Sequence, residues 1–249
     1  MELICNLWEY LGEFKPKMFN TSGIITEDLP PAEFKSVIVS SSDSNLSTYT
    51  FSIITTLSTE ADKAIGVFYS GGFNGTMPTP LSLKLNGQVL SGGYDANQVS
   101  KSTFEGLLGF SWWLNSRVPS TAGSYDVELV WDSSVDWCAI ALYEVYDVDQ
   151  ATPFTDIQSG STLSYDLIGL DSGQVFLGGG VGITDGGTIN ANATQTPTGW
   201  TTDIDFEEVG DVGVFLSGHT LTGDAGDTVE ISGSGAVNRI ASYIRTNKA

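Results

Sequence analysis

The stretch that decides the fold reads Tyr125-Asp126-Val127-Glu128-Leu129-Val130-Trp131. Its odd-numbered residues are all apolar and fall on one side of an extended chain, while the even-numbered ones, two of them acids, fall on the other. This is the pattern of a half-buried antiparallel strand. Thr228–Ile231 repeats it, with Val229 and Ile231 facing inward. The same alternation at two distant places predicts two copies of one strand arrangement.

The repetition covers most of the chain, because residues 48–148 and 161–246 read as two copies of the same order of runs. Each copy leads from an apolar run through a short polar turn into a second run and then to a glycine pair, Gly71-Gly72 or Gly186-Gly187. Each copy closes with further runs that match in order: Leu107–Leu114, Tyr125–Trp131 and Trp137–Val145 in the first, Val212–Leu216, Thr228–Ile231 and Arg239–Ile244 in the second. Duplicated modules without duplicated reactive residues favour scaffolding or binding.

The fold class follows from runs of about five to nine residues, rich in β-branched and aromatic side chains and bounded by Gly, Asn, Asp and Pro. Leu83–Val89 contains an Asn-Gly pair between apolar residues and predicts a tight hairpin. We expect an all-β protein with two tandem antiparallel β-sandwiches, jelly-roll-like in character, and a short N-terminal helical or extended arm. The expected division is residues 1–34 for the arm, 35–149 for the first domain and 150–249 for the second.

The expected linker runs from Asp147 to Phe154. Pro153 fixes its own φ and biases Thr152 toward an extended shape, so the connector is predicted to be short and stiff. Phe154 is expected to tuck against the edge of a sandwich. The two modules should then keep a fixed relation to each other.

The charge is strongly acidic, with a formal net charge of -20 over 249 residues. Such a surface repels phosphate backbones and anionic lipid headgroups, so nucleic acid is not an expected partner. No apolar stretch approaches the length of a membrane-spanning helix, and membrane insertion is not expected either.

The first residues have a pattern of their own, because five apolar side chains recur at helical spacing: Ile4, Leu7, Trp8, Leu11 and Phe14. A single helix of this length is marginal unless that face docks. Docking on its own first domain and docking on a neighbouring subunit are both open. The chain begins without the basic segment and apolar run of a secretory signal.

Aromatic residues give the second binding signal. Trp112 and Trp113 are adjacent, so in a strand one indole points inward and the other outward. With Tyr94 in the adjoining glycine-rich stretch, they form a possible platform for a sugar or a subunit interface. The alternative is that both indoles are covered by a neighbouring loop or module.

Residues that could carry a metal or a cofactor are few. Cys5 and Cys138 are expected to be free thiols, and His219 has no second imidazole with which to bind a transition metal. The acidic runs Asp203–Glu208 and Asp224–Asp227 lack the spacing of a calcium loop, and ordinary turns explain them better. We therefore expect no metal and no cofactor.

Nucleophile and phosphate motifs are also weak. Ser232–Gly235 reads as a loop between strands, not as the strand-to-helix turn that exposes a catalytic serine. The run Gly178–Gly180 lies in a strand-like stretch with no helix after it, so a close backbone approach or a bulge explains it better than a phosphate cradle.

A resemblance to a known module rests on three stretches, which are Trp137–Tyr143, Val148–Phe154 and Pro197–Trp200. Together they resemble a tandem β-sandwich module of uncharacterised bacteriophage virion proteins and marine bacterial surface proteins. The resemblance covers most of residues 45–246, although Asp147 stands where the pattern has Gly. It carries no active site, and it implies a structural or adhesive protein.

The expected function is that of a non-enzymatic bacteriophage virion protein, most simply a capsid decoration or accessory subunit. A tail or head fibre component and a carbohydrate-binding adhesin module are the alternatives. The expected partners are other virion proteins and further copies of the chain, with a surface glycan as an additional possibility. The expected location is the virion, and the alternative is the cell surface.

Overall fold

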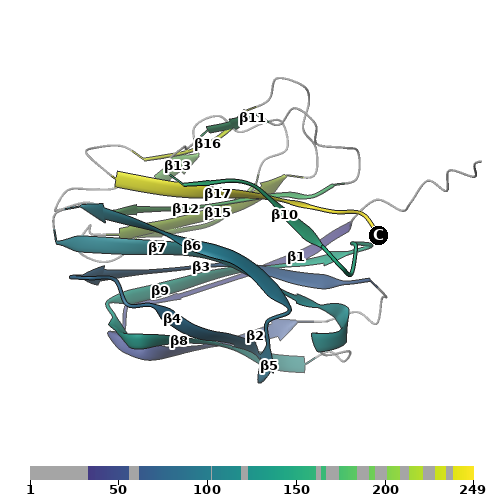
Figure 1. The fold of residues 1–249 in the computed structure, drawn as a ribbon, viewed down its shortest axis with the longest axis horizontal. Helices are drawn as coiled ribbons and strands as arrows, with labels where there is room; N and C mark the ends of the chain where they lie inside the picture. The colour runs from purple at the N-terminus through teal and green to yellow at the C-terminus, as the bar shows by residue number, and fades with distance from the viewer. Residues whose placement is uncertain are drawn as a thin grey trace, which may run out of the picture.

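The structure is a computed structural model that describes residues 33–55, 62–101, 103–118, 123–160, 164–166, 174–183, 191–193, 201–207, 213–220, 228–233 and 238–249. Antiparallel strands make up most of these residues, and the helical element among them is the 3-10 turn η1 (Asn115–Arg117). The predicted all-β, sandwich-type fold is therefore confirmed (Figure 1). Within the same ranges, no helix has the length and apolar character needed to cross a membrane.

The first half of the chain forms two sheets. Its strands are β1 (Glu33–Ser42), β2 (Leu46–Thr55), β3 (Ala64–Asn74), β4 (Pro80–Leu85), β5 (Gln88–Val89), β6 (Gly92–Lys101), β7 (Phe104–Leu114), β8 (Gly123–Val135) and β9 (Trp137–Tyr146). The outer sheet has the order β2-β8-β4-β5, and the inner sheet has the order β1-β9-β3-β7-β6.

The second half repeats this plan. Its strands are β10 (Phe154–Gly160), β11 (Ser164–Asp166), β12 (Phe176–Ile183), β13 (Ala191–Ala193), β14 (Thr201–Glu207), β15 (Gly213–Thr220), β16 (Thr228–Gly233) and β17 (Asn238–Thr246). The orders are β10-β17-β12-β15-β14 and β11-β16-β13, so each of these strands has a counterpart in the first half. The four sheets lie in four layers, with the two five-stranded sheets in the middle (Figure 1). The domain boundaries expected from the sequence stay a prediction.

The outer sandwich layer of the first half bears out the sequence pattern. In β8, Tyr125, Val127, Leu129 and Trp131 are buried, and the residues between them are exposed or half-buried. The hairpin expected at Leu83–Val89 is formed by β4 and β5, with positive φ at both turn residues, Asn86 (47°) and Gly87 (78°). Two such angles in succession are what a tight hairpin turn requires.

Strand β9 is buried along its whole length, from Trp137 to Tyr146. Cys138, Ile140 and Leu142 join the core between the two sheets of the first half. Trp137, Ala139, Ala141 and Tyr143 join the core between the two five-stranded sheets. A strand covered on both faces has no polar side, and this explains the uninterrupted apolar run in the sequence.

The two five-stranded sheets pack face to face through reciprocal contacts. Strand β7 contacts β12, and β15, the counterpart of β7, contacts β3, the counterpart of β12. In the same way β6 contacts β17, and β14, the counterpart of β6, contacts β9, the counterpart of β17. Such exchange of corresponding elements is the property of a two-fold, isologous interface. The two halves of one chain are therefore arranged as a two-fold dimer is.

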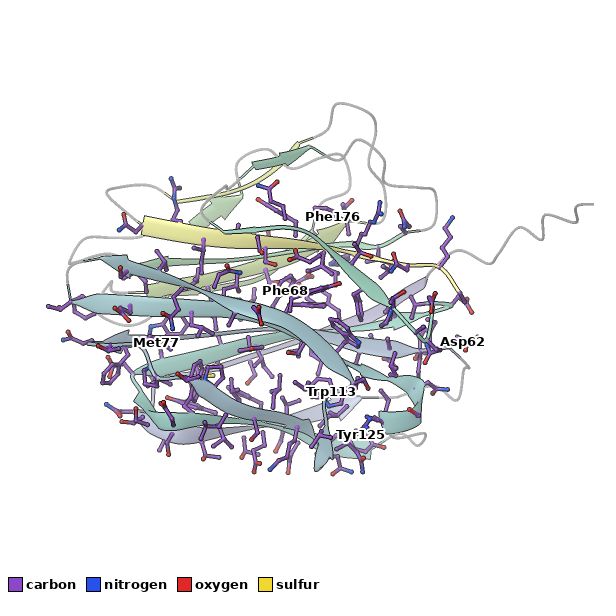
Figure 2. All side chains as sticks on the ribbon, viewed as in Figure 1. Asp62, Phe68, Met77, Trp113, Tyr125 and Phe176 are labelled. Carbon is purple, nitrogen blue, oxygen red and sulfur yellow. The ribbon has the colours of Figure 1, made fainter. Side chains whose placement is uncertain are left out.

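Phe68 and Gly179 meet at the centre of this interface. A Cβ atom added to Gly179 would lie 2.7 Å from Cδ1 of Phe68, so the ring lies directly on the glycine backbone. Figure 2 shows Phe68 pointing into the space between the two middle sheets. The two residues occupy corresponding places. Phe68 pairs with Ala141, the fifth residue of β9, and Gly179 pairs with Ser242, the fifth residue of β17. The close backbone approach expected for Gly178–Gly180 is confirmed.

The linker is fixed by the end of the chain. The amide of Asp149 donates to the carbonyl of Asn247 (3.1 Å), and the amide of Asn247 donates to the carbonyl of Pro153 (2.9 Å). The amide of Ala249 donates to the carbonyl of Asp147 (3.1 Å). The segment after β17 thus pairs with the segment after β9, its counterpart, as two-fold packing requires.

The linker is also fixed to the first half. The Gln150 side chain donates to the carbonyl of Lys63 (3.2 Å) and accepts from the amide of Asn115 (3.2 Å). Phe154 is 2 % exposed, and its ring lies 5.2 Å from that of Phe110. The linker is thus hydrogen-bonded to both halves, and the prediction of a docked Phe154 is confirmed.

Candidate functional site

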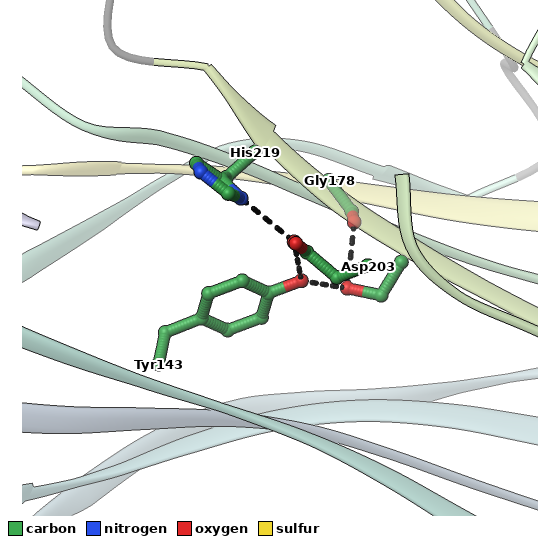
Figure 3. Close-up of polar contacts among 5 residues, drawn as sticks. Tyr143, Gly178, Asp203 and His219 are labelled. Carbon is green, nitrogen blue, oxygen red and sulfur yellow. Dashed lines mark hydrogen bonds and ion pairs between the residues drawn. The ribbon is translucent and has the colours of Figure 1, made fainter. Parts of the chain in front are cut away.

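A group of polar side chains is buried where the two halves meet (Figure 3). Tyr143 comes from β9 in the first half, Asp203 from β14, and Ser217 and His219 from β15 in the second. Ser217 and His219 are two residues apart in one strand, so both point to the same face of their sheet. We call these four residues the polar cluster.

Short contacts connect all four members. The Tyr143 hydroxyl lies 3.0 Å from Oδ2 of Asp203 and 2.5 Å from Oγ of Ser217. Nδ1 of His219 lies 2.8 Å from the same Asp203 oxygen. The Ser217 hydroxyl lies 3.0 Å from the carbonyl oxygen of Gly178. One carboxylate oxygen therefore receives donors from both halves of the chain.

The two hydroxyl groups have one proton each for three contacts. The Tyr143 hydroxyl donates to Asp203, and the Ser217 hydroxyl donates to the carbonyl of Gly178. In the short contact between the two hydroxyl oxygens either oxygen could be the donor, so a proton placed there is withdrawn from Asp203 or from Gly178. The hydrogen bonding of Asp203 is therefore coupled to the orientation of both hydroxyls.

The cluster is almost closed to solvent. The side chains of Asp203 and His219 are 2 % and 11 % exposed. Burial raises the pKa of Tyr143 well above its ordinary value of 10.0, and the charge of Asp203 adds to the effect, while the Ser217 hydrogen bond opposes it. Tyr143 is therefore a neutral hydrogen-bond donor across the physiological range.

The arrangement connects the halves and does not resemble a hydrolytic site. In a serine–histidine pair, the imidazole accepts the proton of the nucleophilic hydroxyl. Here the Ser217 hydroxyl is bonded to Tyr143 and to the Gly178 carbonyl, and the imidazole is bonded to Asp203. What this geometry supplies is a set of charge-assisted hydrogen bonds that fix β9 against β14 and β15.

The corresponding place at the other end of the interface is aromatic. Phe110 pairs with Phe68 as Ser217 pairs with Gly179, so Phe110 and Ser217 are counterparts. By the same registers, Trp112 is the counterpart of His219. Four rings pack here, those of Tyr94, Phe110, Trp112 and Phe154, with centroids 5.1–6.4 Å apart. We call these four residues the aromatic cluster.

Comparison of the chain with family models, with curated proteins and with solved structures finds no match. The site must therefore be interpreted from its own geometry.

The residues of the predicted aromatic platform are found in two different places. Trp113 is fully buried in the core of the first half (Figure 2), and its indole N–H donates to the carbonyl of Gln88 (3.0 Å). Trp112 is half-buried and packs on Tyr94, whose hydroxyl donates to the carbonyl of Phe154 (2.7 Å). Adjacent indoles thus point to opposite faces, as alternation predicts, and Trp112 is the indole with an exposed part.

The other predicted docking residues, Ile4, Leu7, Trp8, Leu11 and Phe14, lie outside the described residues. So do Cys5 and the run Asp224–Asp227. Cys138 is free and buried, and burial raises the pKa of its thiol well above the ordinary value, so it is a poor nucleophile. Within the described part of the chain, no three His, Cys, Asp or Glu residues gather as metal ligands would.

Sequence reasoning missed the polar cluster for two reasons. The turn predicted at Asp203–Glu208 is wrong, because Asp203 to Glu207 belong to strand β14. Tyr143 lies within the apolar run Trp137–Val145, where an aromatic ring indicates core packing and not a polar contact. A signal did exist: Ser217 and His219 are polar at positions where the first copy has Phe110 and Trp112.

Proposed function

We propose that the protein is a non-enzymatic structural subunit whose two modules act as one rigid block. The observation that carries this proposal is the use of the polar cluster. The side chains best suited to chemistry, a histidine, an aspartate and a tyrosine, are hydrogen-bonded to one another across the boundary between the halves. A block of this kind contributes shape and surface charge to an assembly.

The assembly that we propose is a bacteriophage particle, with the chain as a capsid decoration or accessory subunit. Support comes from the resemblance of Trp137–Tyr143 and Val148–Phe154 to virion modules and from the net charge of -20, which suits a solvent-facing layer. Other virion proteins and further copies of the chain would be its partners. A tail or head fibre component is the nearest variant.

Immunogold electron microscopy tests this assignment. An antibody raised against the full-length protein is applied to phage particles purified from the host that produces the chain. Gold on the capsid is the expected result, and gold on the tail would identify the fibre variant. Particles that carry no gold would contradict the virion assignment.

The predicted arm gives a second test. Leu7→Asp with Leu11→Asp places charges on its apolar face and is expected to abolish incorporation into particles while leaving the unfolding midpoint unchanged. Asn6→Asp with Glu9→Gln, at positions off that face, is the matched control and should be incorporated normally. Normal incorporation of the Leu7 and Leu11 variant would contradict the arm hypothesis.

A carbohydrate-binding adhesin module is the second candidate, favoured by the partly exposed ring of Trp112. Exposed indoles stack on sugar rings, whereas the buried Trp113 has no free face to offer. On a glycan array, this candidate predicts saturable binding that is lost in Trp112→Ala. Binding that survives this substitution would place any sugar elsewhere on the molecule.

A further inference from the structure

A hollow lies on the outer sheet of the first half, on the face turned away from the rest of the protein. Its volume is about 450 Å³, within the range of small-ligand sites. It is lined by Thr50 from β2, by Asp126 and Glu128 from β8, and by Lys84, Asn86 and Gly87 from β4 and its turn. The five lining residues other than Gly87 have polar side chains, and none of the six is used in the interface between the halves.

The sheet register sets these side chains in two neighbouring rows. Thr50, Glu128 and Lys84 lie opposite one another across three adjacent strands. Asp126 lies two residues before Glu128 on β8, on the same face of the sheet. Its carbonyl accepts a hydrogen bond from the amide of Asn86 (2.7 Å). The hollow therefore rests on paired strands and on the Asn-Gly turn, which are rigid supports for a binding site.

The charged groups hold one another in place and still have hydrogen-bonding capacity. Lys84 donates to Oε1 of Glu128 (2.9 Å), and Ser52 donates to Oδ1 of Asp126 (2.8 Å). Among the described residues, the second oxygen of each carboxylate and two of the three ammonium protons remain for a ligand. The side chains of Lys84 and Glu128 are 36 % and 38 % exposed, so a ligand can reach them.

We propose that this hollow binds an uncharged, polyhydroxylated ligand, which is to say a neutral glycan. Each sugar hydroxyl donates and accepts at once, and the hollow offers carboxylates beside an ammonium group and an amide. Two carboxylates against one ammonium disfavour an anionic ligand. A divalent cation such as Ca²⁺ needs six or more oxygens, and here a lysine stands beside the carboxylates.

This proposal goes beyond the structural role proposed above and does not depend on it. It also differs from the adhesin candidate, because Trp112 lies in the aromatic cluster between the halves and not on the outer sheet. A glycan site on the outer layer would let a block fixed to an assembly contact a carbohydrate surface.

The test uses the full-length protein on an array of uncharged oligosaccharides, followed by calorimetric titration of the strongest hit. Glu128→Ala should weaken binding at least about tenfold, since it removes a charged hydrogen-bond acceptor. Thr50→Ala should weaken binding about twofold to tenfold. Thr48→Ala is the matched control on the same strand and the same face, outside the lining, and should bind as the unaltered protein does.

Several outcomes would overturn the proposal. They are binding of no uncharged oligosaccharide, equal affinity of Glu128→Ala and the unaltered protein, and loss of binding in Trp112→Ala alone. Titration with CaCl₂ is the last arm: Ca²⁺ binding that Glu128→Ala abolishes, without sugar binding, would make the hollow a cation site. Unchanged unfolding midpoints for Glu128→Ala and Thr50→Ala show that a lost signal is not a lost fold.

Discussion

The two ends of the interface between the halves occupy equivalent places and have opposite chemistry. At one end, Tyr94, Phe110, Trp112 and Phe154 form an aromatic cluster. At the other end, Ser217 and His219 replace Phe110 and Trp112, and they join Tyr143 and Asp203 in a network of hydrogen bonds. Equivalent places in one fold are thus held by two kinds of interaction. Packing of rings tolerates small changes in distance and angle, whereas charge-assisted hydrogen bonds do not.

The difference teaches how one chain selects its own partner half. A symmetric pair would place the same side chain twice at the two-fold centre, and two rings as large as Phe68 could not share the space that Gly179 leaves. The centre pairs Phe68 with Gly179, and one end of the interface is aromatic where the other is polar. Both differences favour pairing of the two unlike halves over pairing of two identical halves. Four changes break or sharpen this comparison.

The largest expected effect is at the aromatic end, where Phe110→Ala removes a ring that is 1 % exposed and packs on Phe68 and Phe154. The free energy of unfolding should fall by about 3–5 kcal/mol, the usual cost of deleting a buried aromatic ring. Urea denaturation followed by tryptophan fluorescence measures it. Ser217→Ala, at the counterpart position, should cost only about 1–2 kcal/mol. Equal losses at the two positions would refute the distinction between packing and bonding.

The next effect is at the centre, where Gly179→Ala puts a Cβ atom 2.7 Å from the Phe68 ring. Replacement of Gly by Ala stabilises where the site can accept it, but here overpacking should cost about 1–3 kcal/mol. Phe68→Leu in the same chain should recover part of the loss, and the double-mutant cycle measures the coupling between the two positions. Additive losses would mean that the ring and the glycine are not in contact.

A smaller effect is expected at the polar end from Tyr143→Phe, which deprives Asp203 of its donor from the first half. At neutral pH the cost should be about 1–2 kcal/mol. The pKa of Tyr143 is raised in the fold, so this group stabilises the protein fully below its ordinary value of 10.0, and the contribution is lost as pH rises toward the folded value. The free energy of unfolding should be measured between pH 9 and pH 11, roughly one unit either side of that value. It should fall less steeply with pH in the variant than in the unaltered protein. A parallel pH profile for the two proteins would contradict this. Tyr94→Phe removes a neutral hydrogen bond at the aromatic end and is the comparison for the cost at neutral pH.

The smallest effect has the opposite sign and compares two carboxylates. Oδ1 of Asp156, beside the aromatic cluster, is buried without a hydrogen-bond partner among the described residues, whereas Asp203 accepts from Tyr143 and His219. Burial raises the pKa of Asp156, so its contribution is present below its ordinary value of 3.8 and is lost as pH rises through the folded value. Asp156→Asn should therefore stabilise at pH 7, by about 0.5 kcal/mol because solvent screens this half-buried group.

The gain from Asp156→Asn should shrink as pH falls through the folded value and disappear below the ordinary value of 3.8, where the carboxyl becomes protonated in the unfolded state too. Asp203→Asn is the matched substitution at the polar end and should destabilise, because it weakens two charge-assisted hydrogen bonds. Thermal unfolding of both variants at pH 7 and at pH 3.5 checks the signs. Destabilisation by both substitutions would show that the two carboxylates are held alike.

Much of the fold could be predicted from local pattern. The alternation in Tyr125–Trp131 gave a strand with one buried face, and the Asn86-Gly87 pair gave a hairpin turn, because both signals depend on neighbours in sequence. The docked Phe154 followed from the rigidity of Pro153. The acidic run beginning at Asp203 favours a turn by composition, and tertiary pairing with β15 overrides that preference.

The candidate site was less accessible to prediction. Trp112 and Trp113 could be assigned to opposite faces, yet which of them reaches solvent depends on the module that covers each face. Tyr143 and His219 are 76 residues apart in the chain, and no periodicity relates residues at that separation. The polar hollow was not anticipated either, because its rows come from three strands whose register is set across the sheet.

By itself, the sequence determined that the chain makes antiparallel strands in two similar sets, since alternation, turn residues and apolar runs are local properties that each copy repeats. Only the tertiary structure decided that the two sets face each other through β9, β3 and their counterparts. That choice depends on the contact between the Phe68 ring and the Gly179 backbone and on the hydrogen bond from Tyr143 to Asp203. Both join residues that are far apart in the chain. Complementarity between distant surfaces is a property of three-dimensional shape, and no stretch of residues carries it alone.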